Sequence, residues 1–154
     1  MAKTDITLSR LKEYLEYNPA TGHLTKRVGY VHPSGHRYVM VDNEVYSEHR
    51  LVWFYNHGKW PEHDIDHING DPSDNRIENL RDVPAAINMQ NERKPRKNNT
   101  SGFLGVHFKK KLQKYGAGIT VRRKRVHLGY FDTPQEAYAA YVTAKRKLHE
   151  GCTI

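Results

Sequence analysis

The sequence has little cysteine and no long apolar run. Cys152 is the single cysteine among 154 residues, which excludes a disulfide framework and a cysteine-based zinc site. No apolar stretch approaches the length of a membrane span, and no signal-peptide pattern opens the chain. The ten histidines are scattered, without the paired spacing typical of zinc ligands. We therefore expect a cytoplasmic protein that has no membrane partner.

Acidic residues are missing from one long stretch. Between Arg93 and Phe131 the sequence contains 12 Lys and Arg and no Asp or Glu. The whole chain carries a formal net charge of +8, although the remainder has more acidic than basic residues. A charge run is often only a solvated face. A concentration of one sign on this scale also predicts a surface for a polyanion, with salt-dependent contacts to phosphates.

The first 60 residues predict a bracing module made of helices and a β-hairpin. The hydrophobic periodicity and the turn residues predict these elements: a helix at 5–17 with a Leu8, Leu11, Leu15 stripe, strands at 23–28, 37–41 and 45–48, and a buried helix at 49–57. Asp42-Asn43 is the expected hairpin turn, and Gly58 ends the second helix. The aromatic run that begins at Trp53 is more typical of a core than of a base-stacking surface.

Polar residues of one chemical kind recur between residues 61 and 92. Asp66 and His67 are adjacent, Asn79 follows a loop rich in turn formers, and Asn88 falls on an expected helix at 85–92. A neutral imidazole can take a proton from water, and carboxylate and amide oxygens suit a hard cation such as Mg²⁺. Strand alternation would point Asp66 and His67 to opposite faces, which is a tension in this interpretation.

The strings D-H-I-N-G-D, D-N-R-I-E-N-L-R and N-M-Q-N resemble the HNH, or ββα-metal, nuclease motif. The likeness is greatest to phage and intron-encoded homing endonucleases, in which Asn replaces the last His. It implies that Asp66 and Asn88 bind one divalent metal, with Mg²⁺ expected and Mn²⁺ able to substitute. It also implies that His67 is the general base and that Asn79 holds its loop and orients its ring. Asn91 matches a less critical position.

One position departs from that motif. The family usually has Thr or Ser at the start of the helix, where Pro84 stands here. Proline suits a first helical turn, so we expect the helix to form. The N-terminal module also resembles the segment that precedes many phage nuclease cores. His49, within that module, could approach the metal site, but a structural role is favoured.

The last third of the chain has a different character. After a basic linker at 93–101, strands are expected at 103–108, 115–121 and 125–130, and Thr133-Pro134 opens a helix with the stripe Ala137, Tyr141, Ala144 and Leu148. S-G-F-L-G-V-H-F and H-L-G-Y-F-D-T-P-Q-E-A-Y-A-A-Y resemble the Apetala-two/ethylene-response-factor DNA-binding domain. The resemblance implies a three-stranded antiparallel sheet, backed by one helix, whose open face enters the major groove.

Several basic residues are candidates for contacts with DNA, mostly with phosphates. They are Arg96, Lys97, Lys109, Lys111, Arg122, Arg123, Arg125 and His127. Alternation places Gly116 and Gly118 on the face toward DNA, where the related family commonly has bulky or basic side chains. Little base-specific readout by this strand is therefore expected.

Together these patterns predict an α+β protein in four parts. They are an N-terminal helix/β-hairpin module at 1–60, a ββα-metal core at 61–92, a linker at 93–101, and a three-stranded sheet packed on one helix at 102–154. The predicted function is a metal-dependent, homing-type HNH endonuclease of phage or bacterial origin that acts on double-stranded DNA. The sequence leaves the oligomeric state open, with a monomer slightly favoured. A DNA-binding regulator with an inactive core is the alternative, and an RNA-binding or structural protein is a further one.

Overall fold

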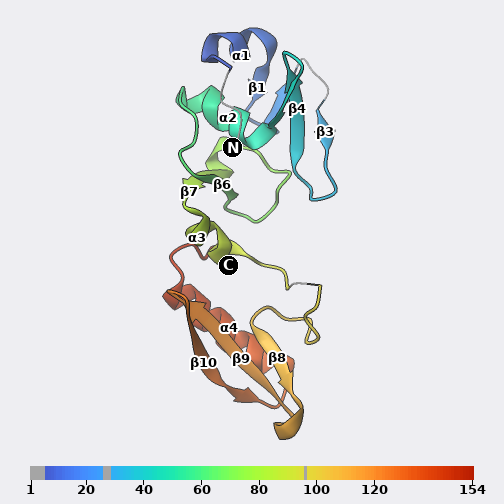
Figure 1. Cartoon of the computed structure of the whole chain (residues 1–154), viewed down its shortest axis with the longest axis vertical. Coiled ribbons are helices and arrows are strands. Elements are labelled where there is room, and N and C mark those ends of the chain that lie inside the picture. Colours follow the sequence, from blue (N-terminus) through green and yellow to red (C-terminus); the bar gives the residue numbers. More distant parts are fainter. Residues whose placement is uncertain (1–5, 26–28, 96) are drawn as a thin grey trace. The chain divides into compact units, whose positions relative to one another are not determined.

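The computed structural model describes residues 6–25, 29–95 and 97–154. The chain divides into two compact units, Met1–Asn88 and Met89–Ile154 (Figure 1). The division falls within the helix predicted for residues 85–92, so the expected bracing module and residues 61–88 of the expected nuclease core lie in one unit. Within the described residues no helix has both the length and the hydropathy needed to cross a bilayer.

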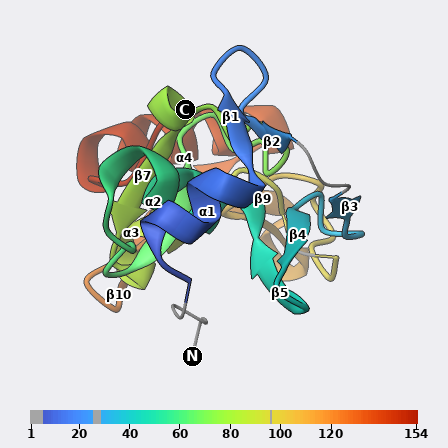
Figure 2. The same cartoon turned by 90° about the horizontal axis from the view of Figure 1, so that it is seen from above.

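The N-terminal unit mixes short helices with three small antiparallel sheets. Its helices and strands are α1 (Leu8–Tyr14), β1 (Glu16–Asn18), β2 (His23–Thr25), β3 (Tyr30–Val31), β4 (Arg37–Val41), β5 (Glu44–Ser47), α2 (Glu48–His57), β6 (Asp64–His67), the 3-10 turn η1 (Ile77–Asn79), β7 (Leu80–Val83) and α3 (Ala85–Asn88). The strand orders are β1-β2, β3-β4-β5 and β6-β7. This content confirms the α+β class. Helices α1 and α2 pack together, as both cartoons show (Figures 1 and 2).

The first helix is shorter than predicted. It begins after Thr7, whose side chain accepts a hydrogen bond from the Arg10 N–H, and it ends at Leu15 in an extended conformation. Residues Glu16–Asn18 then pair with β2, which is a long-range contact that helical periodicity does not report. Residue 5, and residues 26–28 of the predicted strand 23–28, lie outside the described residues.

In the β4–β5 hairpin, turn-forming residues predicted the structure better than hydrophobic periodicity did for the first helix. Asp42 and Asn43 have φ values of 48° and 64°, the left-handed conformation that a two-residue hairpin turn requires. Gly58 ends α2 with φ of 70°, and its N–H donates to the Phe54 carbonyl. Both turns are as predicted, because each depends on neighbouring residues alone.

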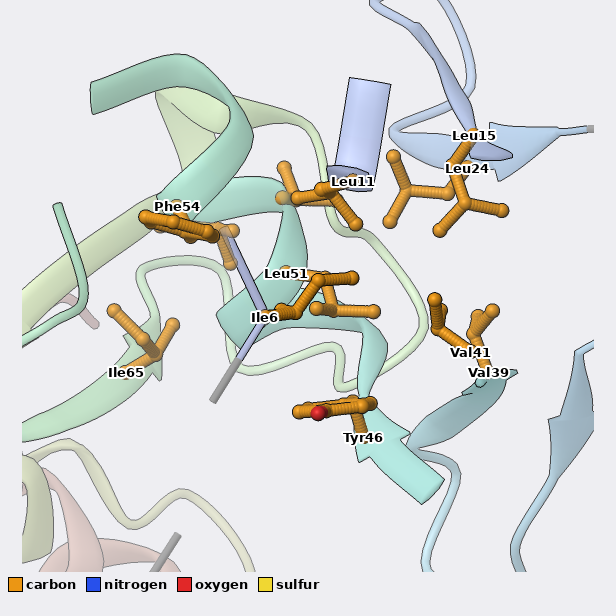
Figure 3. Close-up of a cluster of buried hydrophobic side chains, with 12 residues drawn as sticks. Ile6, Leu11, Leu15, Leu24, Val39, Val41, Tyr46, Leu51, Phe54 and Ile65 are labelled. Carbon is orange, nitrogen blue, oxygen red and sulfur yellow. The ribbon is translucent and has the colours of Figure 1, made fainter. Parts of the chain in front are cut away.

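The core of this unit gathers side chains from α1, α2, β2, β4, β5 and β6 (Figure 3). Leu11, Leu15, Val39, Val41 and Leu51 are fully buried. Complete burial of such a side chain is worth about 1.5–3 kcal/mol. The ring of Trp60 stacks on Phe54 and Tyr46 at the edge of this cluster. The aromatic residues of α2 thus belong to the core, as expected.

Strands β6 and β7 form an antiparallel pair that α3 follows. The first strand of the pair is Asp64–His67, and the predicted helix at 85–92 is α3 followed by a 3-10 turn, η2, at Met89–Asn91. The N–H groups of Ile87 and Asn88 both donate to the Pro84 carbonyl, so the helix starts directly after that proline. Helix α3 packs against β6.

The C-terminal unit is a three-stranded antiparallel sheet in the order β10-β9-β8. Its elements are β8 (Val106–Lys109), the 3-10 turn η3 (Lys110–Leu112), β9 (Lys114–Val121), β10 (Lys124–Phe131) and α4 (Pro134–Leu148). Helix α4 packs on all three strands (Figure 1). Thr133 and Glu136 form a capping box at its start, where the sequence predicted it.

Two predictions for this unit need correction. The first strand begins at Val106 rather than residue 103, because Gly102 and Gly105 have φ values of 76° and 74° and turn the chain. In α4, Leu148 is 40% exposed, whereas Lys145 is 1% exposed. The Lys145 ammonium donates to the Glu92 carbonyl, so its long stem fills the inward position that the apolar stripe assigned to leucine.

The two glycines of the turn allow a matched test of packing. A Cβ on Gly105 would lie 2.1 Å from the Tyr141 ring, whereas one on Gly102 would meet nothing within 4 Å. Both substitutions carry the left-handed backbone cost of about 1–2 kcal/mol. We expect Gly105→Ala to lower the free energy of unfolding by a further ~1–3 kcal/mol through overpacking. Denaturant unfolding of Gly102→Ala and Gly105→Ala checks this, and equal losses would contradict it.

Candidate active site

Asp66 is paired with an arginine across the β6–β7 ladder. Asp66 and Arg81 are directly opposite in register. Arg81 Nη2 and Nε lie 2.7 Å and 2.8 Å from Asp66 Oδ2. The Asp66 side chain is 8% exposed, so the carboxylate is held in a nearly buried position by a cation. A forked guanidinium contact of this kind fixes both position and charge.

His67, the last residue of β6, has different neighbours. The backbone turns immediately after it, where the Gly70 N–H donates to the His67 carbonyl. The His67 ring is buried, and its Nε2 lies 2.9 Å from Asn75 Oδ1. Asn75 Nδ2 in turn donates to Glu48 Oε2 at 2.9 Å. Asp66 and His67 are adjacent in β6 but point to opposite sides and contact different residues, as strand alternation requires.

Two further imidazoles surround the His67 ring. The ring centroids of His36 and His49 lie 5.6 Å and 5.5 Å from that of His67, and 5.2 Å from each other. Burial, with a smaller effect from His67, lowers the pKa of His49 to about 3. Burial likewise lowers the pKa of His36. Both rings are therefore neutral near pH 7, and His67 is packed by uncharged aromatic groups.

Asn79 ties down the loop between His67 and β7. Its side-chain oxygen accepts the Asn69 N–H at 2.9 Å, and its amide donates to the Asp74 carbonyl at 2.7 Å. The Ile68 N–H donates to the Asn79 carbonyl at 2.9 Å. The loop-holding role predicted for Asn79 fits this geometry. The hydrogen bond that reaches the ring of His67 comes from Asn75.

The two remaining asparagines of the motif lie in different units. Asn88 is the last residue of α3, the helix that packs against the strand carrying Asp66. Asn91 belongs to the C-terminal unit, where it is buried and accepts a hydrogen bond from the Thr153 hydroxyl. Asn91 therefore has a structural contact of its own.

The donor set around β6 is oxygen-rich and small. In the part of the chain that the structure describes, no group of three His, Cys, Asp or Glu side chains is placed to hold a metal ion. Asp66 would supply one carboxylate and Asn88 one amide carbonyl. Such a pair fits a hard cation that keeps several waters and takes its other ligands from a phosphate, as Mg²⁺ does. It does not fit a structural zinc ion.

Sequence reasoning missed Glu48, Asn75 and Arg81. Glu48 is fully buried and lies on the same face of α2 as Leu51 and Val52. The sequence did contain a signal for Glu48: it precedes the apolar residues Leu51 and Val52 by three and four positions, so it lies on their helix face. A charged residue on a buried face needs partners. Asn75 was counted among turn formers, and nothing local distinguished it.

The predicted DNA-contacting residues of the C-terminal unit are exposed. On the sheet and its turns these are Lys109 at the end of β8, Lys111 in η3, Arg122 and Arg123 in the β9–β10 turn, and Arg125 and His127 on β10. In the preceding segment Lys97 is also exposed. Arg96 lies outside the described residues. Arg122 and Arg123 have φ values of 47° and 65°. Two-residue turns of this type favour Asn-Gly, so two arginines here are strained.

The outer face of this sheet is not bare at its glycines. A Cβ on Gly116 would lie 2.7 Å from the His107 ring and 3.2 Å from the Tyr130 ring. One on Gly118 would lie 3.0 Å from the Arg125 guanidinium. Side chains of the flanking strands therefore lie over the glycines of β9. Ala117 and Ile119 point the other way and are buried, as alternation predicted.

Comparison with known proteins places this geometry in a family. Residues 46–90 match the family model described as HNH endonuclease. That segment contains Glu48, His67 and Asn75. The chain is 31% identical over 102 residues to Protein 3.8 of Escherichia phage T7, an alignment that spans 66% of this chain and 83% of that protein. No solved structure matches. The chain therefore belongs to the same family as phage T7 Protein 3.8 and carries an HNH endonuclease domain at residues 46–90.

Proposed function

We propose that the protein is a metal-dependent endonuclease that hydrolyses phosphodiester bonds in double-stranded DNA, with His67 as the general base. The observation that carries this proposal is the buried, neutral surrounding of the His67 ring, next to Asp66 and within the segment that matches HNH endonucleases. Asn88 in place of a second histidine favours the homing type.

Asp66 and Asn88 would hold the divalent cation. A bound cation would bind the scissile phosphate and stabilise the leaving oxygen. The chain's own contribution is position: β6 carries Asp66, the packed helix α3 carries Asn88, and Arg81 holds the carboxylate of Asp66 in place. Mg²⁺ is the expected ion, because both donors are oxygen atoms, and Mn²⁺ can substitute.

The C-terminal unit would dock the DNA. The Apetala-two/ethylene-response-factor resemblance assigns the outer sheet face to the major groove. Two features support this assignment: all six predicted contact residues of this sheet are exposed, and two strained arginines occupy its β9–β10 turn. Residues held in sparsely populated backbone conformations often cluster at functional sites. His107, Tyr130 and Arg125, which lie over the glycines, give this face more readout capacity than the sequence indicated.

One observation favours the alternative, a DNA-binding regulator with an inactive core. Arg81 already neutralises Asp66, so a cation must share or displace that contact. Plasmid cleavage in a series of divalent metals, with EDTA as the blank, decides between the two functions. We expect nicked or linear plasmid with Mg²⁺ or Mn²⁺ and intact plasmid in EDTA. Binding without cleavage in every metal would favour the regulator.

His67→Ala should lower the cleavage rate by roughly 10²–10⁴-fold, the usual contribution of a general base. DNA affinity should change little, because the base contributes to the transition state rather than to binding. Single-turnover cleavage and electrophoretic mobility shift, measured side by side, check both. A variant that cuts at the original rate would remove His67 from the mechanism.

Asp66→Asn preserves the shape of the side chain and removes its charge. We expect activity to be lost in both Mg²⁺ and Mn²⁺, because the carboxylate is the single charged ligand. Asn88→Asp should retain part of the activity, since a carboxylate is still an oxygen ligand. Circular dichroism controls for folding, because Asp66 also pairs with Arg81. Full activity of Asp66→Asn would contradict the ligand assignment.

Substitutions in the β9–β10 turn, at Arg122 and Arg123, should change the stability of the protein and its DNA affinity in opposite directions. Arg122→Asn with Arg123→Gly installs the favoured turn residues, so the free energy of unfolding should rise by about 1 kcal/mol. DNA affinity should fall, and the slope of log affinity against log salt should flatten by roughly 0.9 per lost phosphate contact. Lys59→Gln with Lys147→Gln removes the same charge from other exposed positions and serves as the control. Equal losses in both double variants would leave only net charge as the cause.

A further inference from the structure

Three buried side chains from separate parts of the N-terminal unit form one hydrogen-bonded chain. His67 ends β6, Asn75 lies in the following loop, and Glu48 is the first residue of α2. Their exposed fractions are 5%, 0% and 0%. The two links, His67–Asn75 and Asn75–Glu48, are each 2.9 Å. Hydrogen bonds in such a setting are well ordered and cost much to leave unmade.

The direction of this chain follows from what each group can donate. Glu48 Oε1 accepts the Leu24 N–H at 3.0 Å, and Glu48 Oε2 accepts Arg37 Nε at 2.9 Å. The carboxylate is thus an acceptor, and the end of Asn75 that faces it must be the amide nitrogen. The carbonyl end of Asn75 then faces the imidazole. A carbonyl only accepts, so Nε2 of His67 carries the hydrogen.

The backbone of Asn75 is fixed from the other side. A Cβ on Gly22, which has φ of 72°, would lie 2.4 Å from the Asn75 carbonyl carbon and 2.2 Å from the Arg76 nitrogen. The β1–β2 turn therefore packs directly on this backbone. Two residues later, the Ile77 N–H donates to the Tyr17 hydroxyl at 2.9 Å. Asn75 can neither rotate freely nor move away from Glu48.

We propose that Glu48 and Asn75 are positioning residues that set the tautomer of His67. With the hydrogen on Nε2, the lone pair of the neutral ring is on Nδ1. This inference rests on the proposed function, in which His67 is the base. Nδ1 takes a proton from water, and the resulting hydroxide oxygen bonds to phosphorus. The phosphorus–oxygen ester bond then breaks, and the leaving oxygen takes up a proton from solvent.

The tautomer can be observed without any catalysis. In protein labelled with ¹⁵N-histidine, long-range ¹H–¹⁵N correlation distinguishes Nε2–H from Nδ1–H in a neutral ring. The His67 signals are assigned by their absence from His67→Ala. We expect the Nε2–H form alone in the wild-type protein. We expect a mixture in Asn75→Leu, which has nearly the same shape but no acceptor. An Nδ1–H form in the wild type would overturn the inference.

The same variants give a kinetic test. Asn75→Leu should lower kcat by roughly 10–100-fold, the cost usual for a partner that orients an active-site group, with little change in KM. Asn56→Leu applies the same substitution at another site in this unit, where the exposed Asn56 donates to the Val52 carbonyl in α2 and is not one of the three hydrogen-bonded residues. It should leave both tautomer and rate unchanged. If it changes them as Asn75→Leu does, general destabilisation is the cause and the proposal fails.

A reciprocal exchange guards against a variant that does not fold. Asn75→Asp alone places two carboxylates together, whereas Glu48→Gln with Asn75→Asp restores one donor and one acceptor at that link. The double variant should recover the Nε2–H tautomer and part of kcat. An unchanged tautomer and rate in Asn75→Leu would overturn the inference while leaving the nuclease function intact. An Asn75-dependent tautomer in a protein that never cuts DNA would instead overturn the proposed function.

Discussion

The N-terminal unit depends on the burial of one carboxylate. Glu48 is fully buried, and its partners are the backbone of Leu24 in β2, the guanidinium of Arg37 in β4, the ring of His23 and the amide of Asn75. A buried charge costs several kcal/mol unless such partners are in place. Strands of two sheets and the loop after β6 must therefore assemble around the start of α2. Fold and candidate site share this interaction.

The sequence predicted the elements whose signals are local. The Asp42-Asn43 turn, the end of α2 at Gly58 and the start of α4 at Thr133-Pro134 each depend on residues within one turn of chain, and all three are present. The roles of Glu48 and Asn75 depend on a contact between residues 27 positions apart. No periodicity encodes such a contact. The motif thus indicated His67 and Asn79, but not the groups that hold the His67 ring.

In the C-terminal unit, neighbouring side chains decide what two residue types do. Glycines on the outer face of β9 predicted little base-specific readout by that strand, and the side chains of His107, Tyr130 and Arg125 from the flanking strands lie over them. The absence of side chains on these glycines makes room for the neighbours, and alternation gave the face correctly. In α4, Lys145 is buried and Leu148 exposed, because a carbonyl at Glu92 accepts the ammonium. Hydropathy alone does not predict that a lysine is buried when its ammonium group has a hydrogen-bond acceptor.

The close approach of Gly22 to the backbone of Asn75 and Arg76 has a consequence for gene exchange. The segment that matches HNH endonucleases begins at residue 46 and so leaves out Gly22, Tyr17 and Arg37. Recombination that moved this segment alone would separate the loop of the candidate site from the surfaces that shape it. The smallest piece that could be inherited as a working cassette therefore includes the β1–β2 turn. Lineages that shuffle such nucleases should keep both segments together.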